Sequence, residues 1–285
     1  MRQHPTEQYT RHIMIETIKL TELTKRRRAS DDEDSSEIDI SSTDSNSDEE
    51  ERDQEEIVNI DFDFFGGNPA VDFHAIKNLL RQLLGNEESN KVQLSQLSDL
   101  ILNSPTTTIK TDGTESDPYC FLSFVDYKEH CNSNYARYLK KDERMATFLR
   151  TVEANAKKSC ALVLSERLIN MPAEVVPPLY KITLEDVTSA LGNGNNYDFY
   201  VILSRKYEVN FDTDSDSDDE GERSKKRVKQ EEVDYFHAED RYFEKNSKLH
   251  YDLQPKKGLI PTYIVISHQD LLKSISELEH EIETW

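Results

Sequence analysis

The chain has few of the residues on which several common kinds of site depend. Its 285 residues include only three cysteines, eight glycines and one tryptophan. Cys120, Cys131 and Cys160 are odd in number and lack short paired spacings, which argues against a disulfide framework and a zinc site and favours a reducing compartment. The histidines show no i, i+4 pairing and have no cysteine partners, so we expect no metal and no cofactor.

Long apolar runs are also missing. No apolar stretch approaches roughly 20 residues, the length that a membrane-spanning helix needs. The N-terminal region contains Arg2, His4 and Arg11 and no apolar stretch of the signal-peptide kind. We therefore expect a soluble intracellular protein with no membrane partner.

Negative charge, by contrast, is abundant and concentrated. Hydrophobic residues make up only 35% of the chain and charged residues 32%, so part of the chain is expected to be unfolded. Residues 30–56 hold fourteen acidic residues against Arg52 alone, and residues 208–222 hold eight against none. These two acidic tracts account for the whole net charge of -21. We expect them to stay solvated and to serve as interaction segments.

The partner best suited to such tracts is a cation-rich protein. Nucleic acid is a poor candidate, because its phosphates would be repelled and the sequence has no basic patch interleaved with aromatic residues. We expect the protein itself to be a monomer.

An unbroken apolar stretch near the middle of the chain predicts a central strand. Residues 161–164 are apolar at consecutive positions, the pattern expected when both faces of a strand are covered. Residues 165–167, Ser-Glu-Arg, follow where the strand leaves the core, and without a glycine-flanked turn or a fixed-offset histidine they favour a structural ion pair over a nucleophile. The prolines at 172, 177 and 178 predict that the next helix begins after Pro178.

Hydrophobic periodicity predicts strands interspersed with helices over residues 57–285. The expected strands lie at 58–64, 109, 119–125, 160–164, 197–203, 249–253 and 262–266, and the expected helices at 76–84, 94–102, 135–157, 179–191, 239–245 and from 270. The strands at 109 and 119–125 should pair as a hairpin. We predict an α/β fold: a single domain with a mixed, largely central β-sheet flanked by helices. Residues 1–56 should form a disordered arm, and a disordered acidic and basic insertion should interrupt the domain at about 208–232.

Four strings carry a resemblance to a known family. They are LSERLIN at 164–170 followed by a proline-containing turn, VNIDFDFF at 58–65, FYVILSRKY at 199–207 and EDRYFEK at 239–245. In their order along the chain they resemble the BCCIP family of eukaryotic nuclear proteins, whose fungal members are acidic. The resemblance implies a fold similar to that of the GNAT acetyltransferases.

The resemblance also implies a function. Fungal members are described as nuclear escorts of a basic large-subunit ribosomal protein and as factors in nuclear export of a phosphatidylinositol phosphate kinase, and animal members as partners of DNA-repair and cell-cycle proteins. We expect a non-enzymatic nuclear chaperone in ribosome biogenesis that shuttles with the cytoplasm. The alternative is a transport adaptor for the kinase, which would affect actin organisation and vesicular transport. An acetyltransferase is the third hypothesis, but the glycines at 66–67 and 192–194 lack the pattern of a pyrophosphate-binding strand-to-helix turn.

Two short basic clusters have the spacing that nuclear import receptors recognise. They comprise Lys25, Arg26, Arg27 and Arg28 in the arm, and Lys225, Lys226, Arg227 and Lys229 in the insertion. The alternative is that these cations only offset the neighbouring acids.

One set of leucines matches the spacing that an export receptor would recognise: Leu94, Leu97, Leu100 and Leu102. The same spacing lets an amphipathic helix bury one face, and we favour core packing.

Several hydroxyl residues have an acid three positions on, which is the substrate pattern of acidophilic kinases. They are Ser30, Ser36, Ser41, Ser45, Ser47, Thr213, Ser215 and Ser217. Each phosphate would add about -1.5 to -2 charges. The alternative is that serine simply fills a disordered acidic segment.

Overall fold

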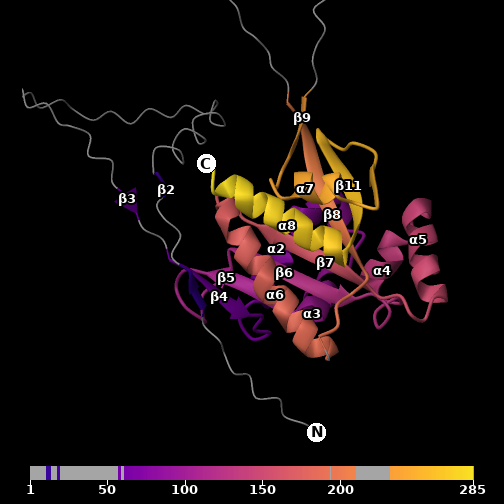
Figure 1. The fold of residues 1–285 in the computed structure, drawn as a ribbon, viewed down its shortest axis with the longest axis horizontal. Helices are drawn as coiled ribbons and strands as arrows, with labels where there is room; N and C mark the ends of the chain where they lie inside the picture. Colours follow the sequence, from indigo (N-terminus) through magenta and orange to yellow (C-terminus); the bar gives the residue numbers. More distant parts are fainter. Residues whose placement is uncertain are drawn as a thin grey trace, which may run out of the picture.

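The computed structural model describes residues 11–13, 18–19, 57–58, 61–192, 194–209 and 232–284 (Figure 1). Its main sheet has nine strands. They are β1 (Arg11–Ile13), β4 (Phe62–Gly66), β5 (Thr106–Lys110), β6 (Cys120–Asp126), β7 (Cys160–Arg167), β8 (Phe199–Val209), β9 (Glu232–Tyr235), β10 (Leu249–Asp252) and β11 (Leu259–Ser267). A separate pair joins β2 (Ile18–Lys19) to β3 (Ile57–Val58).

The predicted central strand is β7, which lies near the middle of the sheet. The strand order is β1-β4-β5-β6-β7-β8-β11-β10, and β9 pairs with the far part of β8. The predicted hairpin is confirmed, because β5 pairs antiparallel with β6. Only β7 and β8 are parallel among the described strand pairs, so the sheet is mixed but mostly antiparallel.

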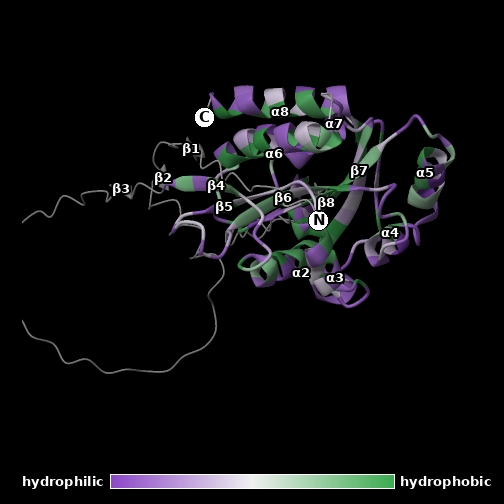
Figure 2. Cartoon of the chain, turned by 90° about the horizontal axis from the view of Figure 1, so that it is seen from below, coloured by the Kyte–Doolittle hydropathy of each residue, from purple (hydrophilic) through white to green (hydrophobic). Residues whose placement is uncertain are grey.

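Helices cover both faces of this sheet (Figure 2). On one face lie α2 (Phe73–Ser89) and α3 (Leu94–Leu102), and on the other α6 (Val176–Leu191), α8 (His268–Ile282) and the short α7 (Asp240–Lys245). Each face has its own hydrophobic core, the first including Leu80 and Ile101 and the second Tyr180 and Leu271. The predicted single α/β domain with a mixed central sheet flanked by helices is confirmed.

The single helix predicted over residues 135–157 is wrong. The segment forms two helices, α4 (Asn134–Leu139) and α5 (Glu143–Ala154). Ser133 caps the first by accepting a hydrogen bond from the Ala136 backbone N–H, and Asp142 caps the second by accepting from Met145. A side-chain cap starts a new helix at Asp142 because it satisfies an N–H group that would otherwise lack a partner.

The helix predicted to begin after Pro178 begins earlier. A single 3-10 turn, η1 (Ala173–Val175), leads directly into α6 at Val176. Pro177 and Pro178 lie in the first turn of α6. There the missing N–H costs nothing and the fixed φ suits a helix, so the prolines mark its start instead of delaying it.

The boundaries of the predicted arm and insertion also change. β8 extends to Val209 and pairs there with Glu232 of β9, so Glu208 and Val209 belong to the sheet. Nine residues of β11 pair along β8 and support this length. Within the arm, β1 pairs with β4, so the arm is not without structure throughout. Residues 20–56 and 210–231, with their predicted disorder, lie outside the described residues.

Candidate functional site

β7 and β8 pair over only four positions before they separate. Their parallel register joins residues 160–163 to residues 199–202. Beyond these positions β7 continues along β6 to Arg167, whereas β8 continues along β11 to Tyr207. The sheet therefore opens into a fork between residues 164–167 of β7 and residues 203–209 of β8.

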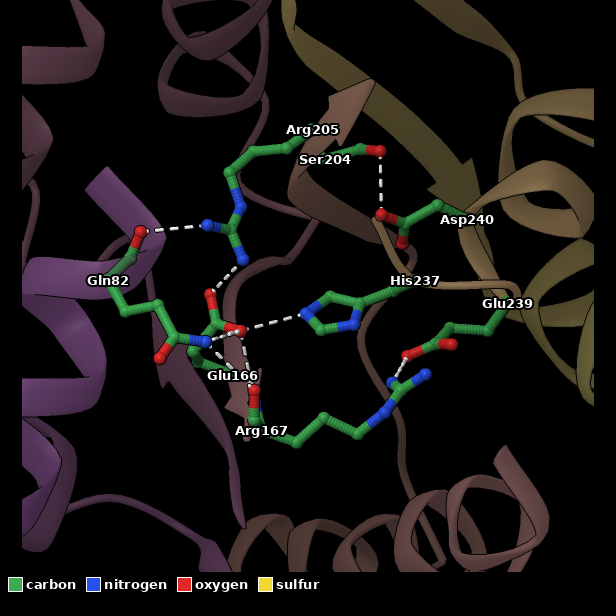
Figure 3. A network of polar contacts seen from close by, with 8 residues as sticks. All are labelled: Gln82, Glu166, Arg167, Ser204, Arg205, His237, Glu239 and Asp240. Carbon is green, nitrogen blue, oxygen red and sulfur yellow. Dashed lines mark hydrogen bonds and ion pairs between the residues drawn. The ribbon is translucent and has the colours of Figure 1, made fainter. Parts of the chain in front are cut away.

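A buried polar network centred on Glu166 fills this fork (Figure 3). Glu166 is 0% exposed. Its carboxylate forms an ion pair with Arg205 of β8, lies 2.8 Å from Nε2 of His237 and accepts a hydrogen bond of 3.1 Å from Nε2 of Gln82 in α2. Arg205 also donates to the Gln82 backbone carbonyl at 2.8 Å. The network thus joins α2, the central strand, β8 and the segment that follows β9.

A second set of buried charges lies beside the first. Arg167 forms an ion pair with Glu239, and the Ser204 hydroxyl donates to Asp240 at 2.6 Å. Burial works to raise the pKa of Glu239, but the charges of Arg167 and His237 and the hydrogen bond from Arg167 together outweigh it and lower that pKa. Burial, together with the negative charge of Glu239, raises the pKa of Asp240 to about 7. The two adjacent carboxyl groups therefore titrate in opposite directions from their ordinary values.

The contacts in the fork hold the segment that follows the insertion, residues 236–240, against the end of the central strand. The Arg205 guanidinium lies 4.6 Å from the ring centroid of Phe236, and His237, Glu239 and Asp240 follow within four residues. Removing one partner of such a buried pair costs about 3–5 kcal/mol, because the other charge is left uncompensated. The structural ion pair predicted at residues 165–167 is confirmed, and the buried side chains leave the fork filled.

The loop between β4 and α2 is closed by its own side chains. Asp72, at the start of α2, is fully buried, accepts from the Asn68 backbone N–H at 2.8 Å and pairs with Lys110 at 2.7 Å. A Cβ on Gly67 would lie 3.2 Å from Cδ2 of Leu102, so glycine permits close packing here. This glycine serves a packed turn, as the sequence indicated, and the Asp72 carboxylate is used within the loop and by Lys110 without capping α2.

Both acidic tracts join the domain at one end of the sheet. The register aligns Phe64, Ile109, Cys120 and Arg167, so β4 begins where β7 ends. β8 runs parallel to β7 and meets β9 at the same end. We call this the fork end. Residues 30–56 precede β4, and the acids of 210–222 follow β8.

The described surface of the fork end is acidic and carries an exposed apolar residue. Asp112, Glu115 and Asp117 are exposed in the turn between β5 and β6. Ile169, in the loop after β7, is 74% exposed, and Val233 of β9 is 44% exposed. Since β6 and β7 are neighbours, the acidic turn and the Ile169 loop leave adjacent strands.

The other predicted sites fall into two groups. Leu94, Leu97 and Leu102 are buried in the core under α3, and Leu100 packs against the same core, which supports core packing over export. The two basic clusters and all the candidate phosphorylation residues lie outside the described residues. They stay predictions.

The described residues hold neither a metal-binding cluster nor a membrane-spanning helix. Within residues 61–192, 194–209 and 232–284, no three histidine, cysteine or acidic side chains gather as a metal-binding group. No helix in this part of the chain is long and apolar enough to cross a bilayer.

Comparison with known proteins defines the class. The BCCIP family model matches residues 57–243, a range that includes the fork and most of the domain. The chain is therefore a member of the BCCIP family, and the resemblance found in the sequence is confirmed.

Similar proteins are found in several yeasts. Protein BCP1 of Candida glabrata is 62% identical over 277 residues, covering 95% of this chain and all of that one. Protein BCP1 of Saccharomyces cerevisiae is 65% identical over 237 residues, covering 81% and 84%. The crystal structure of BCP1 from Saccharomyces cerevisiae matches with a TM-score of 0.70 at 60% identity, covering 84% of this chain and 96% of that chain. The likeness to GNAT acetyltransferases stays a prediction.

Sequence reasoning found Glu166 and Arg167 but missed their partners. Gln82, Arg205, His237 and Glu239 lie 39 to 84 residues from the acids or bases that they contact. One signal was available, since Arg205 and Lys206 occupy a strand beside an apolar run and a cation in such a place needs a buried partner.

Proposed function

We propose that this BCCIP-family chain is a non-enzymatic nuclear chaperone that binds and escorts a basic client, a large-subunit ribosomal protein, in ribosome biogenesis. The observation that carries the proposal is that both acidic tracts join the domain at the fork end. A client drawn by one tract is thereby brought within reach of the other.

Electrostatics gives these tracts their role. Clustered negative charge raises the encounter rate with a lysine- and arginine-rich surface and covers cations that would otherwise bind RNA indiscriminately. The basic clusters at 25–28 and 225–229 would serve nuclear import receptors, so that escort can begin in the cytoplasm and end in the nucleus.

Specificity requires a defined surface between the tracts. Ile169 is the described apolar side chain with the highest exposure, and it projects from the loop directly after the buried fork. An exposed apolar anchor that a partner covers, with charged residues around it, is the arrangement that concentrates binding energy in protein interfaces. We therefore assign Ile169 to the centre of the client surface and Asp112, Glu115 and Asp117 to its rim.

The filled fork supports a binding function over catalysis. Its charged side chains are paired with one another, and Asp72 occupies the start of α2. Neither place offers space for a nucleotide-sized cofactor beside a reactive group.

A matched pair of substitutions tests the proposal. Ile169→Asp at the fork end and Leu272→Asp on α8 place the same charge on two exposed apolar positions, of which Leu272 is 45% exposed. Binding to purified large-subunit ribosomal proteins should weaken about tenfold or more with Ile169→Asp, as expected for a hot-spot residue. Leu272→Asp should bind like the unchanged chain.

Salt dependence adds a second criterion. Affinity of the unchanged chain should fall steeply between low and physiological salt, because exposed charges are screened. Equal weakening by both substitutions, or binding insensitive to salt, would remove the fork end as the client surface.

A further inference from the structure

The end of the sheet opposite the fork carries an excess of positive charge. α4 and α5 lie between the end of β6 and the start of β7, on the far side of the domain from β4 (Figure 1). Residues 126–158 hold eight lysines and arginines against five acidic residues. The remaining residues of 61–209 and 232–284 hold 14 basic against 26 acidic residues. Positive charge is therefore collected in the α4–α5 segment.

Five cations of this segment form what we call the basic face: Arg137, Lys141, Arg144, Arg150 and Lys157. All five are exposed, and none forms a salt bridge with a carboxylate of the described residues. The Arg144 guanidinium lies 3.7 Å from the ring centroid of Tyr251, and the Lys141 ammonium 5.8 Å from that of Tyr138. These contacts hold the two cations against aromatic rings without neutralising their charge, which can still attract an anionic partner.

Most acids of the same segment are already engaged. Asp126 accepts from the Glu129 backbone N–H at 2.9 Å, and Asp142 caps α5 and accepts from Tyr251 at 2.6 Å. Glu153 accepts from Lys140 at 2.7 Å and from Tyr127. Asp142 and Glu153 keep their charge and interact with Arg144 and Arg150, but the eight cations of the segment still outnumber its five acids, so the basic face presents a net positive field.

We propose that the basic face is the docking site of the chain's own acidic tract, residues 30–56, in the client-free protein. The tract supplies fourteen acids against one base, the charge that complements this face. Its reach is sufficient. Residues 20–56 form a loop closed by the pairing of β2 with β3, so its midpoint can extend from that pair by about half of its 37 residues, roughly 60 Å at about 3.3 Å per residue, whereas the eleven residues of β8 span about 36 Å.

Other anionic occupants are less favoured by charge and connectivity. The acids of 210–222 lie in a shorter loop, residues 210–231, which the pairing of β8 with β9 closes, and half of its 22 residues spans only about 36 Å. A nucleic acid would have to approach a chain of net charge -21, whereas the tethered tract acts at an effective concentration in about the millimolar range. A second copy of the chain lacks this advantage of the tether. The docking does not depend on the proposed client.

The test uses the full chain with a spin label on the tract. Ser45→Cys carries a nitroxide in a Cys131→Ser background, since Cys120 and Cys160 are buried. Amide signals of α4 and α5 should be lost at low salt and return at high salt. The loss should also disappear in Arg137→Glu with Arg150→Glu, but persist in the matched control Lys77→Glu with Arg81→Glu on α2, which changes the net charge equally.

Three results would overturn the proposal. The first is loss of signal elsewhere on the domain, or none. The second concerns docking between copies. The chain that carries both the nitroxide and the isotope label is diluted into chain with neither label, at constant total concentration, and a loss of amide signal that then vanishes indicates docking between copies. The third is binding of single-stranded RNA to the full chain that is lost when Arg137 and Arg150 are substituted. Failure of the client assay with the docking intact would remove the proposed function alone.

Discussion

The two ends of the sheet handle charge in opposite ways. At the fork end the charges inside the domain are buried and paired, and the exposed charges include the carboxylates of Asp112, Glu115 and Asp117 beside the two acidic tracts, with Lys257 in the turn before β11 as an exposed cation. At the α4–α5 end Asp142 and Glu153 are held in a cap and in hydrogen bonds, and the five cations of the basic face are exposed. A domain with 22 basic and 31 acidic residues is thus electrically polarised, because its one segment with an excess of cations lies at the end opposite the fork.

The comparison also separates structural charges from those available for binding. Buried pairs at the fork fix the chain and have little freedom to meet a partner, while exposed charges add little to stability and act on encounter. Substitutions at the two ends should therefore differ sharply in their effect on the free energy of unfolding.

The largest effect is expected in the fork. Glu166→Gln leaves Arg205 buried without its carboxylate and should lower the free energy of unfolding by about 3–5 kcal/mol. Urea unfolding followed by circular dichroism gives this value. The double change Glu166→Leu with Arg205→Met should recover much of the loss, because no unpaired charge remains. A loss below about 1 kcal/mol for Glu166→Gln would place the pair among surface salt bridges.

A smaller, pH-dependent effect is expected at Asp240. Its folded pKa of about 7 lies above the ordinary value of 3.8, so the native state holds the proton more tightly than the unfolded chain. This stabilisation is fully present below pH 3.8 and is lost as pH rises through 7, at about 1.4 kcal/mol per pH unit. Asp240→Asn should remove that fall.

The measurement is urea unfolding between pH 5 and 8 of the unchanged chain and the variant. Asp252→Asn is the control, because hydrogen bonds from Thr262 and Lys206 overcome the effect of burial and lower the pKa of Asp252. Asp252→Asn should leave the slope of the free energy of unfolding against pH unchanged between pH 5 and 8. Parallel slopes for Asp240→Asn and the unchanged chain would show that Asp240 is ionised in the fold.

The smallest effect is expected at the basic face. Arg137→Glu with Arg150→Glu alters exposed side chains without salt-bridge partners among the described residues, so the free energy of unfolding should change by no more than about 0.5 kcal/mol per site. Thermal unfolding in physiological salt measures it. A larger loss of the free energy of unfolding would show that Arg137 and Arg150 stabilise the fold, and the two ends of the sheet would then not differ in this respect.

The sequence predicted the layout of the fold better than its polar contacts. Consecutive apolar residues at 161–164 identified the central strand, because burial on both faces removes alternation. The partners of Glu166 were beyond reach, since Gln82 and His237 are brought to it only by the packing of α2 and the return of β9.

The polarity of the domain was hidden for a related reason. The excess of eight bases over five acids in residues 126–158 can be counted in the sequence, but which of these side chains are exposed on one surface cannot. Tertiary contacts engage two of the acids, Asp142 with Tyr251 and Glu153 with Tyr127, and the sequence does not show these contacts. The break before α5 was within reach, since an Asp-Glu pair beginning an apolar-periodic run is a helix start.

Hydrogen exchange of the full chain, alone and with a purified large-subunit ribosomal protein, tests the central claim most directly. The account predicts that the client slows amide exchange at the fork end, in residues 111–118, 168–172 and 232–238, and leaves α4 and α5 unprotected. Protection of α4 and α5 with an unchanged fork end would contradict it, because the client would then bind the end that carries the exposed cations.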